Sequence, residues 1–336
     1  MQTLAIVILN WNGSDMMRRY LPSVVSNSVG DVIVADNAST DDSIQMLSRE
    51  FPEVRTILLD QNYGFAEGYN RALAQLTEYK YFMLLNSDVE IRQKGWDKIL
   101  CDYMDHHPEC AACQPKLLSL REPDHFEYAG ASGGFIDRYG YPFCRGRILG
   151  TVEKDNGQYD DIHPVLWATG ASLLCRAEDW TKSGGLDPRF FAHMEEIDLC
   201  WRLRNMGREI VCIPQSTAYH LGGATLNQGN PRKTFLNFRN NRYMLRKNLP
   251  ADQLKKIIRM RNFLDLVAAL QFLLKGDIKN MKAVLRAMHS KMPAEGKTAG
   301  TRNSPAVISD KPLLAPYSII WQYYARGKHF FSQLPE

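Results

Sequence analysis

The sequence of 336 residues lacks a long hydrophobic run and an ordered set of cysteines. Its longest strongly apolar stretch, residues 263–274, contains Asp265 and is shorter than the roughly 20 residues that a membrane-spanning helix needs. Seven cysteines are scattered along the chain, and the CxxC pair of Cys110 and Cys113 has no second pair or nearby histidine to complete a zinc site. Because no secretory signal stands at the N-terminus, we expect a cytoplasmic protein with buried thiols.

Glycine-rich phosphate-binding motifs are also missing. The chain contains neither GxGxxG nor a P-loop, which argues against a dinucleotide-binding enzyme and a P-loop NTPase. The net charge of +4 is small but uneven, since residues 250–336 contain 14 Lys and Arg against 6 Asp and Glu, whereas residues 1–249 contain 27 against 31. The basic C-terminal part predicts contact with an anionic surface. No nucleic-acid-binding motif accompanies it, so nucleic acid is not expected as a partner.

The first part of the chain alternates between apolar runs of strand length and segments with helical spacing. The runs lie at residues 4–9, 32–35, 54–59 and 81–85, and the helical segments at 14–27, 41–49 and 67–77, with Ser14 and Thr40 as predicted caps. This alternation predicts an α/β fold with a parallel sheet, in which ligands bind beyond the carboxyl ends of the strands. Polar clusters stand at or just beyond these ends: Asn10-Trp11-Asn12, Asp36-Asn37, Asn62-Tyr63-Gly64 and Asn86-Ser87-Asp88.

The rest of the chain is predicted to be less regular. Strands are expected at residues 111–118, 166–175 and 209–213, helices at 195–206, 231–248, 252–274, 278–291 and 316–331, and a linker at 293–312. Pro214 is expected to stop the last strand, because proline cannot donate to a strand ladder.

Asp88 and Asp36 each follow a predicted strand, and each has two interpretations. Asp88 can hold a divalent metal while leaving coordination positions for phosphate oxygens and water, or it can cap a turn. Asp36 can accept a hydrogen bond from the ring N–H of a pyrimidine base, or it can form an Asx turn. The residues alone leave both choices open.

Three carboxylates fall within residues 195–198, at the predicted start of a helix. Acidic residues are favoured there by the helix dipole, which is the structural explanation. The apolar residues 190–194 favour a second one, because burial raises the pKa of a carboxyl group toward the range of a general base. His220 is a further candidate, since together with Asp88 it would give a mixed oxygen and nitrogen site for Mg²⁺ or Mn²⁺.

Taken in order, these segments resemble the family 2 glycosyltransferases of the GT-A fold. The matching segments are Leu9 to Gly13, Asp36 to Asp41, Asn62 to Ala66 with Gly68 and Asn70, Leu85 to Asp88, residues 167–175 (WATGASLLC), residues 190–202 (FFAHMEEIDLCWR) and His220 to Gly223. The resemblance covers about residues 4–248 and is strongest to the bacterial rhamnosyltransferase-like enzymes. It implies a catalytic domain at residues 1–248, with a Rossmann-like, mostly parallel sheet and helices on both faces, and a basic helical extension at residues 249–336.

The resemblance also implies roles for single residues. Asp36 would hold uracil or thymine, and Asp88 would coordinate Mg²⁺ or Mn²⁺ on the donor diphosphate with the help of His220. The catalytic base would be Glu196, with Glu195 as the alternative. The other implied site residues are Asn10, Trp11, Asn62, Gly64, Asn70 and Asn86 at the nucleotide and Trp167, Gly170 and Ala171 at the transferred sugar and acceptor.

Two positions depart from the family pattern. Asn86 stands where the Asp-x-Asp metal motif has its first carboxylate, and Glu196 stands where the family has an aspartate. Both types of side chain are compatible with the chemistry, although the first leaves one carboxylate fewer for the metal.

We therefore expect an inverting glycosyltransferase that moves a sugar from a UDP or dTDP donor, such as dTDP-rhamnose, to a hydroxyl of a lipid-linked cell-surface glycan. The basic and apolar C-terminal helices predict peripheral association with the inner face of the cell membrane. Packing on the catalytic domain or a homodimer interface is the alternative for these helices. A non-catalytic sugar-nucleotide-binding or scaffold protein on the same fold is the alternative function.

Overall fold

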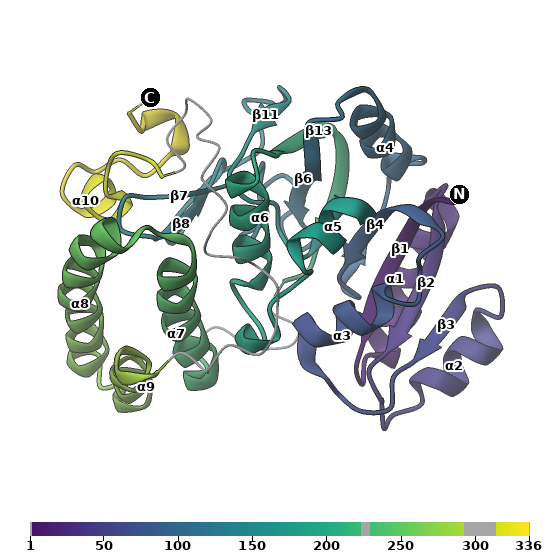
Figure 1. The fold of residues 1–336 in the computed structure, drawn as a ribbon, viewed down its shortest axis with the longest axis horizontal. Coiled ribbons are helices and arrows are strands. Elements are labelled where there is room, and N and C mark those ends of the chain that lie inside the picture. The colour runs from purple at the N-terminus through teal and green to yellow at the C-terminus, as the bar shows by residue number, and fades with distance from the viewer. Residues whose placement is uncertain (1, 223–228, 292–313, 336) are drawn as a thin grey trace.

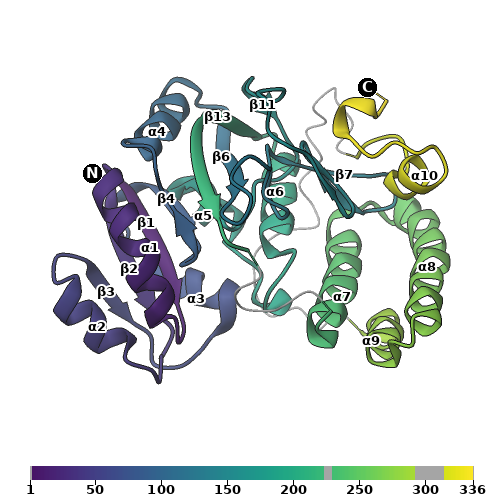
Figure 2. The same ribbon diagram turned by 180° about the vertical axis from the view of Figure 1, so that it is seen from behind.

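The computed structural model describes residues 2–222, 229–291 and 314–335. The predicted linker at 293–312 and Gly223 lie outside these residues. Figures 1 and 2 show a central sheet covered by helices on both faces, with a group of C-terminal helices beside it. One apolar core lies on each face of the sheet: residues of α3, α5 and α6 form the first, and residues of α1, α2 and α4 form the second.

The N-terminal part forms the parallel strands that the apolar runs predict. Its elements are β1 (Gln2–Asn10), α1 (Ser14–Asn27), β2 (Asp31–Asp36), α2 (Ser43–Glu50), β3 (Arg55–Leu58), α3 (Gly64–Leu73) and β4 (Tyr79–Leu85). Strand β1 pairs in parallel with β2 and β4, and β2 pairs in parallel with β3. Ile6 and Val7 are both fully buried although they point to opposite faces, which explains why these strands are apolar throughout.

Asp41 supplies the carboxylate at two helix starts, in place of the predicted caps. Its Oδ2 accepts the backbone N–H of Ser14, the first residue of α1, at 3.1 Å, and its Oδ1 accepts that of Ser43, the first residue of α2, at 3.0 Å. The predictions that Ser14 and Thr40 act as caps are therefore wrong. Helix α3 also begins earlier than predicted, at Gly64.

The middle of the chain makes the large sheet mixed. Its strands are β5 (Val89–Glu90), β6 (Cys110–Ser119), β11 (His163–Pro164), β12 (Ser172–Arg176) and β13 (Glu209–His220). Over the described residues, the strand order is β11-β13-β6-β12-β4-β1-β2-β3, with β5 paired to β13. Strands β6 and β13 are parallel to each other, and β12 is antiparallel to both β4 and β6.

Two strand boundaries differ from the sequence predictions. Strand β13 continues beyond Pro214 to His220, because a shift in register between Ile213 and Thr217 takes the proline out of the regular ladder. Strand β12 begins only at Ser172, so the predicted strand over 166–171 is wrong. The extension of β13 matters for the site, since it places His220 at the end of a strand.

A small antiparallel sheet and three helices complete the middle region. These elements are β7 (Gly134–Ile136), β8 (Pro142–Cys144), β9 (Arg147–Ile148), β10 (Thr151–Val152), α4 (Trp96–His106), α5 (Ala177–Ser183) and α6 (Glu195–Asn205). Helix α6 ends at Asn205, and Gly207, which was predicted to close it, follows two residues later at a positive φ of 80°.

The C-terminal helices pack beside this body (Figure 1). They are α7 (Pro231–Asn248), α8 (Ala251–Leu274), α9 (Ile278–His289) and α10 (Ile319–Tyr324). The helix predicted over 316–331 is largely wrong, since α10 ends at Tyr324 and only a short 3₁₀ turn at Phe331–Gln333 follows. Among the described helices, none combines the length and the apolar character needed to cross a membrane.

Candidate active site

Asn10 and Asp36 lie side by side at the carboxyl ends of β1 and β2, as predicted. They are register partners, both are 1% exposed, and the Asn10 amide donates to Asp36 Oδ2 at 2.9 Å. Asp36 Oδ1 accepts the backbone N–H of Ser39 at 2.8 Å, which is the Asx turn that the sequence left open. Trp11 is 52% exposed beside this pair. Both Asp36 oxygens are thus engaged, while Asn10 Oδ1 is buried with no hydrogen-bond partner among the described residues.

Asn37 links the end of β2 to the start of α3 through hydrogen bonds of its side chain. It was not among the predicted site residues. Its amide donates to Asn62 Oδ1 at 3.1 Å and to the Gly64 carbonyl at 3.0 Å, and its Oδ1 accepts the Tyr63 N–H at 2.9 Å. Its place in the Asp36-Asn37 cluster, at the end of a predicted strand, is the sequence feature that could have identified Asn37. Asn62 and Gly64, both predicted site residues, are therefore held against the ends of the parallel strands.

Asn70 and Trp167 have their polar groups engaged within the fold. The Asn70 amide donates to the Leu186 carbonyl at 2.7 Å, and its Oδ1 accepts the Leu186 N–H at 3.0 Å. Trp167 is 2% exposed and donates its indole N–H to the Phe135 carbonyl at 3.0 Å. Their roles at the nucleotide and the sugar stay predictions.

Asp88, just beyond β4, meets His220 at the end of β13. His220 Nε2 lies 3.1 Å from Asp88 Oδ1 and 3.3 Å from the Asn86 amide nitrogen. On its other side, His220 Nδ1 lies 3.3 Å from Glu127 Oε1. The structure thus brings His220 to Asn86 and Asp88, which lie more than 130 positions earlier in the chain, and it adds Glu127.

His220 and the carboxylates of Asp88 and Glu127 stabilise each other's charged forms. Burial lowers the pKa of His220, but Glu127 and Asp88 on its two sides outweigh burial and raise that pKa to about 10. Burial likewise raises the pKa of Asp88, but the hydrogen bond and charge of His220 outweigh it, so the net pKa of Asp88 is lowered. Without a ligand, the imidazole is therefore a cation between two carboxylates.

The donor set of this cluster fits a divalent cation. A carboxylate and an imidazole nitrogen suit Mn²⁺ or Mg²⁺, and binding would require His220 to release its proton. Glu127 next to Nδ1 is placed to orient the ring, as carboxylates do for metal-binding histidines. The described residues contain no group of three His, Cys, Asp or Glu side chains arranged to hold a metal, so the remaining ligands would come from substrate and water.

Lys233 on α7 lies between this cluster and the start of α6. Burial lowers the pKa of Lys233, against the opposing charge of Glu127, and the charge of Lys233 acts on His193 in turn. Lys233 was not among the predicted site residues. It belongs to a basic helical segment, and the sequence does not distinguish it from the other basic residues there. It adds a positive charge where an anionic ligand would bind.

The segment before α6 has an unusual backbone that other residues hold in place. Phe191, His193 and Met194 have positive φ angles of 66°, 71° and 74°, which non-glycine residues rarely adopt. The buried amide of Asn240 lies within hydrogen-bond distance of the Phe190, Ala192 and His193 carbonyls, at 2.7 to 2.9 Å. Strained backbone that is held this firmly is typical of functional sites.

Glu195 and Glu196 are the first two residues of α6, and each has one carboxylate oxygen without a hydrogen-bond partner in the part of the chain that the structure describes. This oxygen, Oε2, is buried in both. Burial raises the pKa of Glu196 to about 7, and burial together with the charge of Glu196 raises that of Glu195 well above its usual value. Glu195 is 4% exposed, whereas Glu196 is half-buried.

Gly170 and Ala171 connect Glu196 to the cluster at Asp88. A Cβ atom at Gly170 would lie 3.3 Å from Phe65 and 3.6 Å from Glu196 Cβ, so the glycine lies directly beside the start of α6. Next to it, the Ala171 carbonyl accepts the backbone N–H of Asn86 at 3.0 Å. The predicted base, the predicted sugar-site residues and the predicted metal pair are therefore neighbours.

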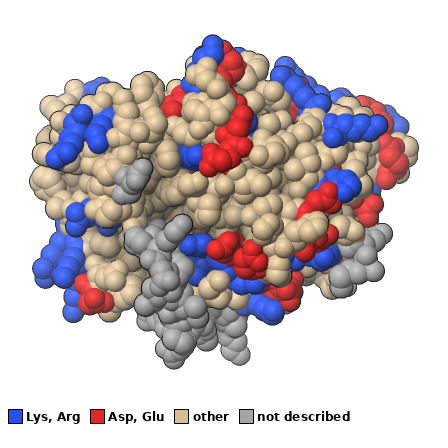
Figure 3. All heavy atoms as spheres, turned by 90° about the horizontal axis from the view of Figure 1, so that it is seen from above, with Lys and Arg blue, Asp and Glu red and all other residues tan. Residues whose placement is uncertain are grey.

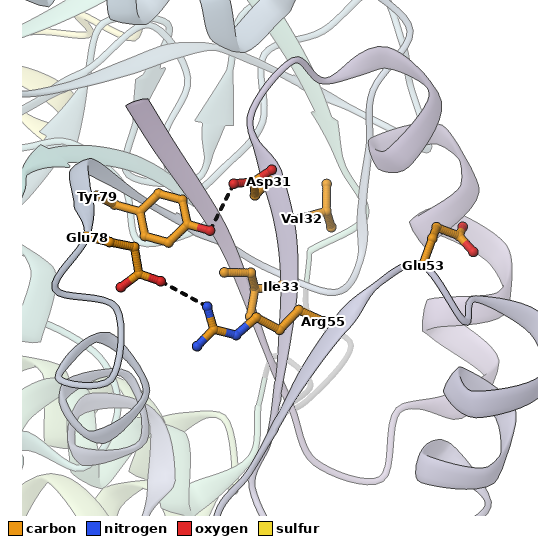
Figure 4. A pocket seen from close by; sticks show the side chains of 7 residues that line it. All are labelled: Asp31, Val32, Ile33, Glu53, Arg55, Glu78 and Tyr79. Atoms are coloured by element: carbon orange, nitrogen blue, oxygen red, sulfur yellow. Dashed lines mark hydrogen bonds and ion pairs between the residues drawn. The ribbon is translucent and has the colours of Figure 1, made fainter. Parts of the chain in front are cut away.

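A pocket of about 290 Å³ lies elsewhere, at the amino ends of β2 and β4 (Figure 4). Its charged groups bind one another, with Arg55 3.0 Å from Glu78 and the Tyr79 hydroxyl 2.9 Å from Asp31. None of the predicted site residues lines it. This pocket is at the opposite end of the strands from the candidate site.

Comparison with known proteins agrees with this geometry. Residues 5–149 match the model of glycosyl transferase family 2. This part of the chain is therefore similar to that family. The matched residues include the strand-end clusters at Asn10, Asp36, Asn62 and Asp88.

One similar curated protein is the N-acetylglucosaminyl-diphospho-decaprenol L-rhamnosyltransferase of Mycobacterium tuberculosis. It is 28% identical over 236 residues, which cover 65% of this chain and 75% of the relative. This similarity is consistent with the resemblance to rhamnosyltransferase-like enzymes that the sequence suggested.

Two solved structures share the fold. The structure of GalNAc-T7 with UDP, GalNAc and Mn²⁺ has a TM-score of 0.56 at 14% identity over 78% of this chain, which covers 55% of that chain. The mannosyltransferase PcManGT of Pyrobaculum calidifontis, with GDP-Man and Mn²⁺, has a TM-score of 0.51 at 13% identity over 87% of this chain and 77% of its own. The fold of this chain is therefore GT-A, with C-terminal helices added.

Proposed function

We propose that this chain transfers a sugar, with inversion, from a nucleoside diphosphate donor to a hydroxyl of a lipid-linked cell-surface glycan. The donor would be dTDP-rhamnose or a UDP-sugar. The observation on which this depends most is Glu196, a half-buried glutamate whose Oε2 has no hydrogen-bond partner among the described residues and whose pKa is raised to about 7, near the strand-end cluster of Asp88 and His220. The name of the mycobacterial relative supports both rhamnose and a lipid-linked acceptor.

Glu196 would act as the general base. It takes the proton of the acceptor hydroxyl while that oxygen forms a bond to the anomeric carbon, and the bond from this carbon to the diphosphate breaks with its electron pair on the leaving oxygen. A base with a pKa near 7 is half-ionised at neutral pH and still basic enough to accept a proton. Glu195 is the alternative base, and burial together with the charge of Glu196 raises its pKa well above the usual value.

The leaving diphosphate would lie at the strand ends. A divalent cation held by Asp88 and His220 would supply positive charge to the departing diphosphate. Lys233 adds a fixed positive charge at the same place, and Asn10 offers an unpaired carbonyl oxygen to the nucleotide. Holding donor and acceptor in line would supply much of the remaining rate enhancement.

A non-catalytic sugar-nucleotide-binding protein is the second candidate. Asn86 favours it, because the metal motif has one carboxylate fewer than the Asp-x-Asp pattern. The two candidates share the nucleotide site and differ in the need for Glu196.

Thermal-shift measurements with UDP, dTDP and GDP, each with and without Mn²⁺, test the nucleotide site. A ligand at 100 times its Kd stabilises a protein by about 2.7 kcal/mol, so a rise in Tm of several degrees is expected with one pyrimidine nucleotide and Mn²⁺. The Asp88→Asn variant should lose the Mn²⁺-dependent part, while Asp31→Asn in the remote pocket should keep it. The proposal fails if no nucleotide raises Tm, or if both variants respond like the parent protein.

A further inference from the structure

Helix α8 is anchored to the body through one side only. Asp265 is fully buried on its inner side, 2.9 Å from Arg242 of α7 and 3.1 Å from Arg261 one turn earlier. Ala269, one turn later, is 4% exposed. These residues recur every four positions, so they define one face of the helix and fix which face points outward.

The opposite side of the C-terminal half of α8 is apolar and exposed. The outer apolar face, as we name it, consists of Phe263, Leu266, Val267, Leu270, Leu273 and Leu274, with exposed fractions of 62%, 51%, 47%, 53%, 47% and 79%. Their spacing of three and four residues puts them on one side of the helix. A contiguous exposed patch of this kind is uncommon on a soluble protein and marks an interaction surface.

Basic residues border the outer apolar face at both ends. Exposed basic side chains precede it at Lys255, Lys256 and Arg259 and follow it at Lys275, Lys279 and Lys282. Of the acidic residues on α8, Asp265 is buried and Asp252 lies in the first turn, while Asp277 caps α9 by accepting the Asn280 N–H. Figure 3, seen from above, shows more basic than acidic side chains on the side where the C-terminal helices lie.

We propose that the outer apolar face of α8 docks on the surface of a membrane with anionic lipids. An amphipathic helix with exposed large apolar residues and flanking lysines suits the boundary between headgroups and acyl chains. A second copy of the chain is the poorer occupant, because two such faces would bring their bordering lysines together without acidic partners.

The C-terminal end of α8 lies at the same end of the molecule as the candidate active site, although α8 itself is at the opposite edge from β1 and β2 (Figures 1 and 2). Helix α9, the carboxyl ends of β1 and β2 and the start of α6 all lie at this end. Docking would therefore hold this end near the bilayer, where the glycan of a lipid-linked acceptor begins. That consequence rests on the proposed function, whereas membrane docking itself does not.

Vesicle flotation of the full chain tests the docking. The protein should float with vesicles of phosphatidylcholine and phosphatidylglycerol, and float less with pure phosphatidylcholine or in 1 M salt. Leu270→Gln combined with Leu274→Gln should reduce binding at least tenfold, and Lys275→Gln roughly fivefold, since a lysine near an anionic surface contributes about 1 kcal/mol. Val29→Gln, at an exposed apolar position of 69% on the distant N-terminal part, is the matched control and should bind like the parent protein.

Three results would overturn the docking proposal. These are no binding of the parent protein to anionic vesicles, equal binding of the double variant, or a dimer in light scattering that the double variant abolishes while vesicle binding is absent. All substituted positions are exposed, so unchanged circular dichroism and Tm are expected and should be checked. The nucleotide thermal shift is measured on the same variants, so a failure of the nucleotide site would be recognised separately from a failure of docking.

Discussion

Two pairs of buried carboxylates lie within twelve residues of each other and have opposite surroundings. Asp198 is fully buried and accepts from Arg202 at 2.9 Å, Lys247 at 2.8 Å and Asn248 at 2.8 Å. Asp187 is bound in the same way by Arg189 and Lys247, and its pKa is lowered, because these partners outweigh burial. Glu195 and Glu196, by contrast, have raised pKa values and unpaired oxygens.

The difference separates a structural use of acidic residues from a chemical one. Lys247 joins α7 to Asp187 and Asp198, so this pair of aspartates fixes the frame around α6. Among the described residues, the two glutamates have no comparable ion pair with a lysine or arginine. They therefore lower the stability of the fold, because a buried carboxylate oxygen without a partner is unfavourable. Sites that keep such groups are usually functional. Substituting each of these acidic residues in turn tests whether its role is structural or chemical.

Glu196→Gln should have the largest effect. Loss of the general base should lower the rate of sugar transfer at least 10²-fold and up to about 10⁴-fold. In the parent protein, the rate should fall as pH drops through about 7, because the Glu196 carboxylate is then protonated, and the variant should lose this dependence. The readout is labelled sugar transferred from the nucleotide donor into the lipid fraction of membranes.

The nucleotide thermal shift serves as the control for this variant and should be retained. Transfer within a factor of ten of the parent rate would reject Glu196 as the base. Loss of nucleotide binding as well would mean that the substitution damaged the site as a whole.

Asp198→Asn should have the next largest effect, on stability. It leaves Arg202 and Lys247 partly buried without full compensation, and breaking a buried ion pair in this way costs about 3 kcal/mol. Urea unfolding measures the loss. Glu178→Gln is the matched control, because its pair with Lys182 is exposed on the surface and should matter by less than about 1 kcal/mol. Equal effects of the two substitutions would show that the aspartate pair does not hold the frame.

The sequence predicted the strand ends of the site well, for a physical reason. In a parallel sheet the carboxyl ends of strands share one edge, so residues just beyond apolar runs must come together. Asn10, Asp36 and Asp88 follow such runs, and each lies at that edge. Glu195 and Glu196 were recognisable because acidic residues followed an apolar segment at a helix start.

Other parts could not be predicted, because they depend on contacts between distant segments. Glu127 lies in an irregular stretch, and only the fold brings it within 3.3 Å of His220. The extension of β13 past Pro214 depends on its pairing with β6, which local sequence does not encode. Asp41 took the roles of the predicted caps through a contact between the starts of α1 and α2.

Glu195→Gln should have the smallest effect, and an opposite one, since it should stabilise the protein. The pKa of Glu195 is raised on folding, so above the usual value of 4.5 the folded chain keeps a proton that the unfolded chain has lost. The stability of the parent protein therefore falls as pH rises through this range. Glutamine has the same shape and no proton to lose, so the gain of the variant should grow with pH and reach roughly 2 °C in Tm near pH 8.

Comparing this gain at pH 5 and pH 8 decides what the unpaired glutamates cost. Glu178→Gln is again the control, because its exposed partner Lys182 keeps its charge at both pH values, and it should show a small difference that does not change with pH. A gain for Glu195→Gln that grows with pH would mean that the chain keeps an unfavourable carboxylate next to the base Glu196, as expected for a group retained for chemistry. A loss of stability at both pH values would mean that Glu195 has a favourable partner in the folded chain, and the contrast with Asp198 would then disappear.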